Sequence, residues 1–183
     1  MSERRPAEAA PVIVIDLQTG MLDGVLEPPL NGAAELVDRA RTVIEWARRS
    51  GRAVAFVRHD GPPGDTLAPG APGWPVWPAL GQAEDEPTFA KRVGDAFSNA
   101  ALGAWVADQG AGEVVLLGAQ TNECIAASVG GAISAGLGVT VVSDAHGTVD
   151  SGGETAAQII ARHNAKFAAD GVNLVTTQSL TGA

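Results

Sequence analysis

Six short segments, most of them runs of β-branched and other apolar residues, divide the chain. They predict strands at residues 12–15, 53–57, 88–91, 114–117, 139–142 and 172–175. Between most of these segments, apolar residues recur every three or four positions, which is typical of helices that pack by one face. This spacing predicts a helix between Asn31 and Gly51 and further helices at residues 96–109, 122–135 and 151–169. Strands and helices therefore alternate along the chain.

Such alternation predicts a parallel sheet that is covered by helices on both faces. We expect an α/β fold, a three-layer α/β/α sandwich with a mostly parallel six-stranded sheet of Rossmann-like type. The length of 183 residues favours one domain. We place it at residues 11–183, after a disordered tail of residues 1–10. Ligands of such sheets bind at the carboxyl ends of the strands, so the residues that follow each strand are the first candidates for a site.

Residues 59–87 show no periodicity and are rich in proline and glycine. A loop of this length in a compact domain is usually functional or disordered. Trp74 and Trp77 favour an ordered loop that lies over another part of the molecule. Because small-molecule pockets favour aromatic walls, we expect at least one of these tryptophans to line the pocket. The loop is then expected to help determine the substrate.

The charge and the single cysteine exclude several classes of protein. A formal net charge of −9 disfavours nucleic acid as a partner. The chain contains no signal-peptide pattern and no apolar stretch of the ~18 residues that a membrane span needs, so we expect a cytoplasmic protein without a membrane partner. Cys124 is the only cysteine, which excludes a disulfide framework within the chain and a multi-cysteine zinc site.

Two common activities of this fold class lack their motifs. The turn after the first strand has no G-x-G-x-x-G for a dinucleotide, and the nearest match to the G-x-S-x-G of α/β-hydrolases lacks its first glycine. A carboxylate, an amine and a thiol remain at three strand ends, namely Asp16, Lys91 and Cys124. A helix N-terminus and a nearby ammonium would lower the pKa of the thiol. From spacing alone, a nucleophilic cysteine and a merely buried one are equally supported.

Four stretches resemble the isochorismatase-like cysteine hydrolase family: residues 12–18, 91–97, 118–125 and 141–148. The similarity runs in order from about residue 11 to about residue 180. Its most specific element is the G-x-x-T-x-x-C pattern that begins at Gly118 and ends at Cys124. The resemblance implies that Asp16, Lys91 and Cys124 form a catalytic triad. It also implies a cis peptide before Gln120 and an oxyanion hole made by the backbone N–H groups of Gln120 and Cys124.

Two departures from the family's patterns bear on the chemistry. The metal-binding histidine pattern of the nicotinamidases is missing, because His59-Asp60 is followed by no further histidine until His146. We therefore expect no metal and no other cofactor. The isochorismatases themselves commonly lack the cysteine, which favours an amide over an ether as the bond that is cleaved. The pocket is expected to include five further side chains: Leu22, His59, Trp74, Trp77 and Phe97.

The resulting hypothesis is a metal-independent cysteine hydrolase that cleaves a small-molecule amide, a C–N bond, through a thioester intermediate. Two alternatives stay open. One is a hydrolase of an ether-type bond that does not need Cys124, and the other is a non-catalytic binding or redox-sensing protein that uses a thiol of low pKa. The resemblance also implies a homo-oligomer, a dimer or a multiple of it. The small residues at 130–132 and Ala135 would allow close helix approach.

Overall fold

The computed structural model describes residues 7, 10–25 and 27–182. Most of the tail predicted at residues 1–10 therefore lies outside the described residues. The two of its residues that are described are both in contact with the rest of the chain. Ala10 is fully buried in the core, and the backbone N–H of Ala7 donates to Oε2 of Glu113.

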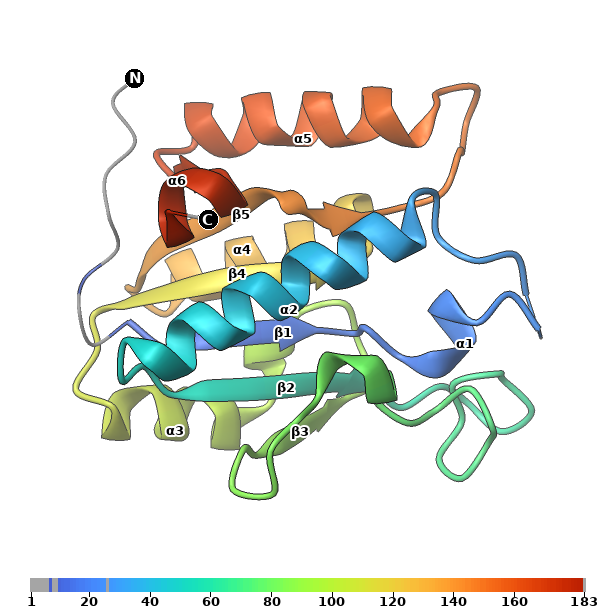
Figure 1. Ribbon diagram of the computed structural model, residues 1–183, viewed down its shortest axis with the longest axis horizontal. Coiled ribbons are helices and arrows are strands. Elements are labelled where there is room, and N and C mark those ends of the chain that lie inside the picture. The colour runs from blue at the N-terminus through green and yellow to red at the C-terminus, as the bar shows by residue number, and fades with distance from the viewer. Residues whose placement is uncertain (1–6, 8–9, 26, 183) are drawn as a thin grey trace.

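A six-stranded sheet forms the centre of the molecule (Figure 1). Its strands are β1 (Val12–Ile15), β2 (Val54–His59), β3 (Thr88–Lys91), β4 (Glu113–Ala119), β5 (Gly138–Gly147) and β6 (Asn173–Val175). They lie in the order β3-β2-β1-β4-β5-β6, and all five neighbouring pairs are parallel. This order runs outward from β1 in both directions, so the predicted Rossmann-like sheet is confirmed and its topological switch point lies between β1 and β4.

The central strands β1 and β4 are almost entirely apolar because both faces of the sheet are covered there. Within β1, Val12 and Val14 point into one core, while Ile13 and Ile15 point into the other. All four side chains are at most 1% exposed. Alternate residues of β4 divide between the two cores in the same way. The period of two that strands impose therefore fills two separate hydrophobic layers.

Helices α2 (Ala33–Arg49) and α6 (Thr177–Thr181) cover one face of the sheet, and α3 (Ala100–Asp108), α4 (Ala126–Ser134) and α5 (Ala156–Ala169) cover the other. Short helical segments complete the chain: α1 (Thr19–Leu22), η1 (Pro78–Leu80), η2 (Ala96–Ser98) and the π-helical turn η3 (Thr121–Ile125). Among the described residues, none of the helices combines the length and apolar character that a membrane crossing requires.

The helix bounds differ from the prediction where polar side chains compete for backbone groups. The predicted helix at 96–109 is broken at Asn99, whose extended backbone and side chain cap the start of α3. The predicted helix at 151–169 begins only after Thr155, which forms a capping box with Gln158. Strand β5 runs five residues past its predicted end, to Gly147. The short helix α6 was not predicted.

Gly118 lies where β4 passes closest to β1. Its φ of +128° is in a region that other residues rarely adopt, and a Cβ there would lie 2.0 Å from the carbonyl oxygen of Ile15. We expect Gly118→Ala to lower the free energy of unfolding by about 3 kcal/mol or more, because neither backbone can move away within the sheet. Urea denaturation measures this.

Gly130 in α4 provides the matched control for that substitution. A Cβ at this position would meet nothing within 4 Å. Gly130→Ala should therefore raise stability by about 0.5–1 kcal/mol through helix propensity. A Gly118→Ala variant as stable as the native protein would contradict the close approach of the two strands.

Candidate active site

The carboxyl ends of four strands bring together the side chains that the sequence singled out. Asp16 directly follows β1, His59 ends β2 and Lys91 ends β3. Cys124 lies in η3, the turn that follows β4. Because β1 and β4 are neighbours at the switch point, the carboxylate and the thiol face the same crevice. The structure thus brings Asp16, Lys91 and Cys124 together, with His59 beside them.

The Lys91 ammonium holds this group together. Its Nζ lies 2.6 Å from Oδ2 of Asp16, 3.1 Å from Sγ of Cys124 and 3.4 Å from Nδ1 of His59. The side chains of Lys91 and Asp16 are both fully buried. An ammonium has three N–H groups and only donates, so these three partners use all of its hydrogen-bonding capacity. Lys91 therefore positions the carboxylate and the thiol.

Asp16 has a left-handed backbone, with φ of 51°, and is the one described non-glycine residue with a positive φ. Aspartate is one of the few residues that adopt this conformation readily. Burial raises the pKa of its carboxyl, while the charge and the hydrogen bond of Lys91 oppose that rise. A carboxylate held ionised in a dry site by one ammonium can act as a general base.

The thiol of Cys124 differs from the sequence-based expectation. Burial is the largest cause of a rise in its pKa to about 11. The negative charge of Asp16 acts in the same direction, and Lys91 only partly opposes the two effects. The expected lowering of the thiol pKa was therefore wrong for the free protein, because the sequence did not indicate how deeply the thiol is buried. A thiol with this pKa keeps its proton at neutral pH, and the carboxylate of Asp16 lies beside it.

This protonation state has a measurable consequence. The rate at which iodoacetamide alkylates Cys124 should keep rising with pH beyond pH 9, because the thiolate is the reacting form and the pKa is about 11. The measurement is a pH series of alkylation rates followed by mass spectrometry, with unambiguous labelling because Cys124 is the only cysteine. A rate that levels off below pH 8 would instead reveal a thiolate already formed in the free protein.

Gln120 and the segment after it are fixed by a buried threonine. The Ala119–Gln120 peptide is cis, at the position where the family resemblance implies one. The hydroxyl of Thr148 lies 3.1 Å from Oε1 of Gln120 and 2.6 Å from Oδ1 of Asn122. No described residue accepts a hydrogen bond from the backbone N–H of Gln120. This N–H is thus available to a ligand beside the thiol.

A cavity of about 690 Å³ opens above the thiol. Asp16, His59, Gln120 and Cys124 line one part of it. The remaining lining comes from the segments after β1, β2, β4 and β5: Gly20, Met21, Glu27, Pro28, Pro29, Leu30, Asn31, Asp65, Thr66, Leu67, Glu123, Val149 and Asp150. The volume is within the usual range for small-molecule sites.

Comparisons with known proteins agree with this geometry. A sequence model of the isochorismatase domain matches residues 10–177. The chain belongs to the isochorismatase-like cysteine hydrolase family. Two relatives from Streptomyces noursei, each named streptothricin hydrolase, are 33% identical over 139 residues and 30% identical over 146 residues. These matches cover 76% and 80% of this chain but only 50% and 56% of the relatives. The chain thus spans about half the length of the curated relatives that it matches.

Solved structures of isochorismatase-like hydrolases share the whole fold. An isochorismatase from Pseudomonas putida KT2440 is 31% identical and has a TM-score of 0.88, with 97% of this chain and 93% of that chain covered. A cysteine hydrolase from Pseudomonas syringae has the same TM-score at 20% identity, with 100% and 97% covered. At that identity, the second similarity concerns the fold alone.

Four of the five side chains that were predicted to form the pocket do not line the main cavity. Trp74 anchors the long loop, since its indole N–H donates to Oδ1 of Asp60 and Arg58 stacks on its ring at 3.5 Å. Trp77 and Leu22 line a separate hollow beside α2. Phe97 packs against the core beneath α3 and α4. Of the predicted pocket side chains, only His59 lines the main cavity.

The physical reason is that an aromatic side chain needs burial, but the sequence does not say on which side of a loop. Residues 59–87 do contribute to the cavity, through Asp65, Thr66 and Leu67 instead of the tryptophans. Met21 lines the cavity in place of Leu22, because adjacent residues of a helix point in different directions. Position after a strand is the signal that could have identified Glu123 and Asp150.

The buried Gln18 fastens the long loop to the site. Its Nε2 donates to the carbonyl oxygens of His59 and Trp74, at 3.1 and 2.8 Å, and its Oε1 accepts from the backbone N–H of His59 at 2.9 Å. The amide group thereby joins the end of β2 to the loop that leaves it. His59 is held at the rim of the cavity by these bonds.

A metal ion would compete with Lys91 for the same space. Ligand atoms of Asp16, His59 and Cys124 all lie within 4.8 Å of one another, an arrangement that could hold a cation. The Lys91 ammonium already contacts all three residues. The positive charge that this group requires is therefore supplied by the chain itself, and the donors do not fit a metal while Lys91 remains between them.

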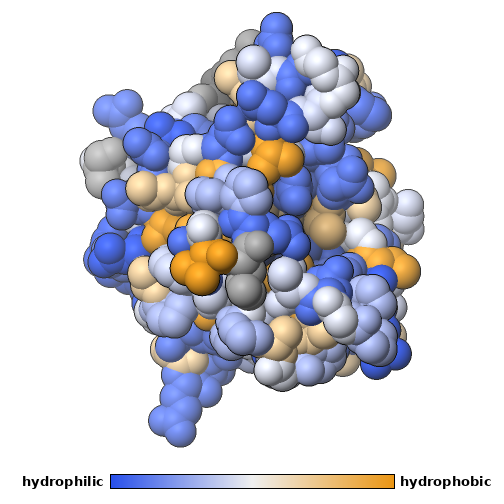
Figure 2. Space-filling view, turned by 90° about the vertical axis from the view of Figure 1, so that its right-hand side faces the viewer, coloured by the Kyte–Doolittle hydropathy of each residue, from blue (hydrophilic) through white to orange (hydrophobic). Residues whose placement is uncertain are grey.

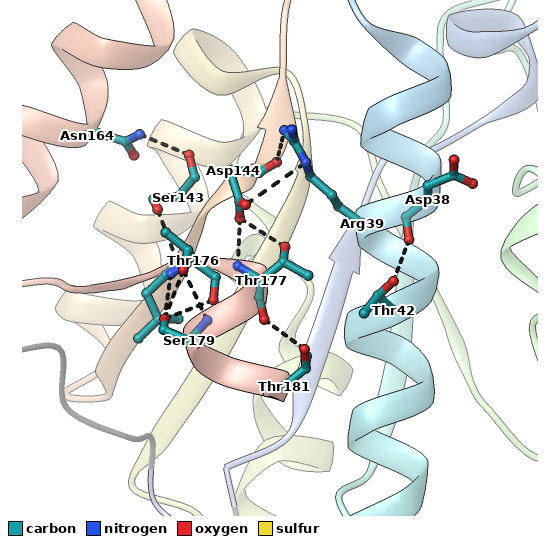
Figure 3. A network of polar contacts seen from close by, with 11 residues as sticks. Asp38, Arg39, Thr42, Ser143, Asp144, Asn164, Thr176, Thr177, Ser179 and Thr181 are labelled. Atoms are coloured by element: carbon teal, nitrogen blue, oxygen red, sulfur yellow. Dashed lines mark hydrogen bonds and ion pairs between the residues drawn. The ribbon is translucent and has the colours of Figure 1, made fainter. Parts of the chain in front are cut away.

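Two other residues at the ends of strands have structural roles. Asp144, in β5, accepts from the N–H and hydroxyl of Thr177 at 2.8 and 2.9 Å, and Arg39 donates to its backbone carbonyl (Figure 3). These bonds fasten α6 and α2 to the sheet. His146 is buried between Thr121 and Asn164, and burial lowers its pKa to about 4. A neutral imidazole there holds η3 against α5.

Proposed function

We propose that this chain hydrolyses the C–N bond of a small-molecule amide through a thioester at Cys124. The observation that carries the proposal is that the Lys91 ammonium contacts both Asp16 and Cys124, and that these two side chains line a cavity open to a ligand. A thiol beside a general base, with both oriented by a third group, is the arrangement of nucleophilic catalysis. The names of the two streptothricin hydrolases support hydrolysis of a small molecule.

Acylation of the thiol is the first half of the reaction. Asp16 accepts the Cys124 proton while Sγ attacks the amide carbonyl carbon. The backbone N–H groups of Gln120 and Cys124 stabilise the oxygen anion that develops. The C–N bond then breaks, Asp16 returns the proton to the leaving nitrogen, and an amine or ammonia departs. The acyl group remains as a thioester.

Hydrolysis of the thioester is the second half. Asp16, again ionised, accepts a proton from a water molecule while the oxygen of that water attacks the thioester carbon. The C–S bond breaks, the Cys124 sulfur recovers the proton, and a carboxylic acid leaves. Lys91 keeps its proton throughout, because its role is to hold Asp16 and Cys124 in place and to balance the charge of the carboxylate. No step requires a cofactor.

A panel of small amides tests the proposal, with ammonia or amine release as the measurement. The native protein should hydrolyse at least one member, and Cys124→Ala should hydrolyse none. Prior treatment with EDTA should leave the rate unchanged. Restoration by zinc or iron of a rate abolished by EDTA would contradict the metal-independent mechanism. The raised pKa of Cys124 argues against the alternative of a redox sensor, because such sensors depend on a thiolate at neutral pH.

We also propose a homo-oligomer. The surface expected for it needs revision, since Ala132 is buried in the chain's own core. Exposed apolar side chains lie nearby instead, with Val93 55% and Ile133 43% exposed. Light scattering of the native protein should give a multiple of 18.5 kDa.

A further inference from the structure

Four carboxylates besides that of the triad line the active-site cavity: Glu27, Asp65, Glu123 and Asp150. They come from four separate segments, which follow β1, β2, β4 and β5 respectively. No lysine or arginine is among the described residues that line the cavity. On the face that carries these strand ends, many hydrophilic residues surround several apolar patches (Figure 2). The fold therefore brings the four negative charges together from separate parts of the sequence.

Within the part of the chain that the structure describes, these four carboxylates lack basic partners. Among the described residues, no lysine or arginine forms an ion pair with any of the four. By contrast, the buried Asp16 has Lys91 as its partner. Asp16 also lines the cavity, so its carboxylate adds to the acidic lining even though Lys91 pairs with it. A ligand in the cavity thus meets four solvent-exposed negative charges that no described lysine or arginine pairs with.

Local contacts hold three of the carboxylates in place. Oε1 of Glu27 accepts from the hydroxyl of Thr66, which joins the segment after β1 to the long loop. Oδ1 of Asp65 accepts from the N–H of Leu67. Oδ1 of Asp150 accepts from the side chain of Asn31 and from the N–H that begins α5. Fixed charges of this kind bind a cation without first having to be ordered.

We infer that the cavity selects amides that carry an ammonium or guanidinium group away from the scissile bond, with Glu27 and Glu123 as specificity-determining residues. This inference rests on the proposed amide hydrolysis. Glu123, which precedes the proposed nucleophile in the chain, and Glu27, on the segment that follows β1, both line the cavity and are exposed to a ligand. A positive group on the substrate gains attraction from both, whereas an anionic substrate is repelled.

Three amides of matched length test this selectivity: 5-guanidinopentanamide, the neutral 5-ureidopentanamide and the anionic monoamide of adipic acid. The native protein should prefer the guanidinium compound over the urea by about tenfold in kcat/KM, and the anion should be the poorest. The double variant Glu27→Gln/Glu123→Gln should lose about fivefold or more of this preference. Equal kcat/KM for the three amides would overturn the inference.

The control variant changes the net charge equally but away from the cavity. Glu45 and Glu84 are exposed and lie outside its lining. Glu45→Gln/Glu84→Gln should keep the native preference. If this variant loses as much preference as the double variant in the cavity, the effect comes from overall charge, and the assignment to Glu27 and Glu123 is wrong.

A second measurement separates the failure of this inference from that of the proposed function. Cys124, the only cysteine, can be modified by methanethiosulfonates that carry a trimethylammonium or a sulfonate group. The thiolate displaces methanesulfinate and forms a disulfide. For each protein, the rate with the cationic reagent is divided by the rate with the anionic reagent, and this ratio is compared with the same ratio for 2-mercaptoethanol. The native protein should show a ratio about tenfold higher than that of 2-mercaptoethanol, and the ratio should fall in Glu27→Gln/Glu123→Gln. A high ratio without hydrolysis of any amide would refute the proposed function alone, and a ratio near that of 2-mercaptoethanol would refute the charge selectivity alone.

Discussion

Replacing Lys91 with methionine is expected to abolish turnover and to lower the free energy of unfolding by about 3–5 kcal/mol. The ammonium is the ion-pair partner of the fully buried Asp16, at 2.6 Å, and also contacts the thiol. Without it, burial would keep Asp16 protonated, and a neutral carboxyl cannot accept the proton of Cys124. Urea denaturation and the amide assay measure the two effects.

The double variant Asp16→Asn/Lys91→Met separates stability from catalysis. It removes both charges, so no uncompensated charge stays buried, and asparagine tolerates the left-handed backbone of position 16. We expect it to recover most of the lost stability and none of the activity. If Lys91→Met were as stable as the native protein, the buried pair would not be held as the structure describes.

The triad could be predicted because it depends on features that a sequence reveals. Runs such as 12–15 and 114–117 mark buried strands, and parallel strands place their carboxyl ends at one edge. Asp16 follows the first run, and Lys91 ends a short strand. The position of Cys124 could be predicted because only one short turn separates it from β4. The resemblance then gave these positions their roles.

The pocket walls could not be predicted, because they depend on the path of a long loop. Trp74 and Trp77 were chosen for their size, yet side-chain and backbone contacts turn both away from the cavity. The residues that do line it, such as Asp65 and Thr66, are ordinary loop residues whose position depends on bonds that distant segments form. Gln18 supplies several of these bonds, and nothing in its sequence context indicates them.

The thiol pKa was mispredicted for a related reason. A helix N-terminus and a nearby lysine are visible in the sequence, and both lower the pKa of a thiol. The opposing effects of burial and of the Asp16 charge appear only when the chain is folded, and they raise the pKa to about 11. The proposed mechanism therefore requires proton transfer from Cys124 to Asp16 at the moment of attack. Whether the nucleophile is a thiol or a hydroxyl should therefore decide whether Asp16 can accept its proton.

Replacing Cys124 with serine should lower kcat for amide hydrolysis by at least about 10⁴-fold, since residues of a catalytic triad act as a unit. A serine hydroxyl is a far weaker acid than a thiol, and Asp16 alone, already paired with Lys91, is too weak a base to activate it. The fold should be retained, with Tm changed by less than about 4 °C, because the substitution alters one partly buried atom. Mass spectrometry of samples quenched during turnover should detect the acyl group on the native protein and not on the variant.

The same variant decides between the amide and ether hypotheses. An ether-type hydrolysis that does not use the thiol would continue in Cys124→Ser, because Asp16 would still line the cavity with Lys91 paired to it. Full activity of this variant on a vinyl ether, with no amide hydrolysed by the native protein, would therefore replace the thioester mechanism by one in which Asp16 acts directly as the proton donor. Loss of activity on every substrate, together with an acylated Cys124 in the native protein, is the result expected here. It follows from a thiol that lies beside a carboxylate held in place by a lysine.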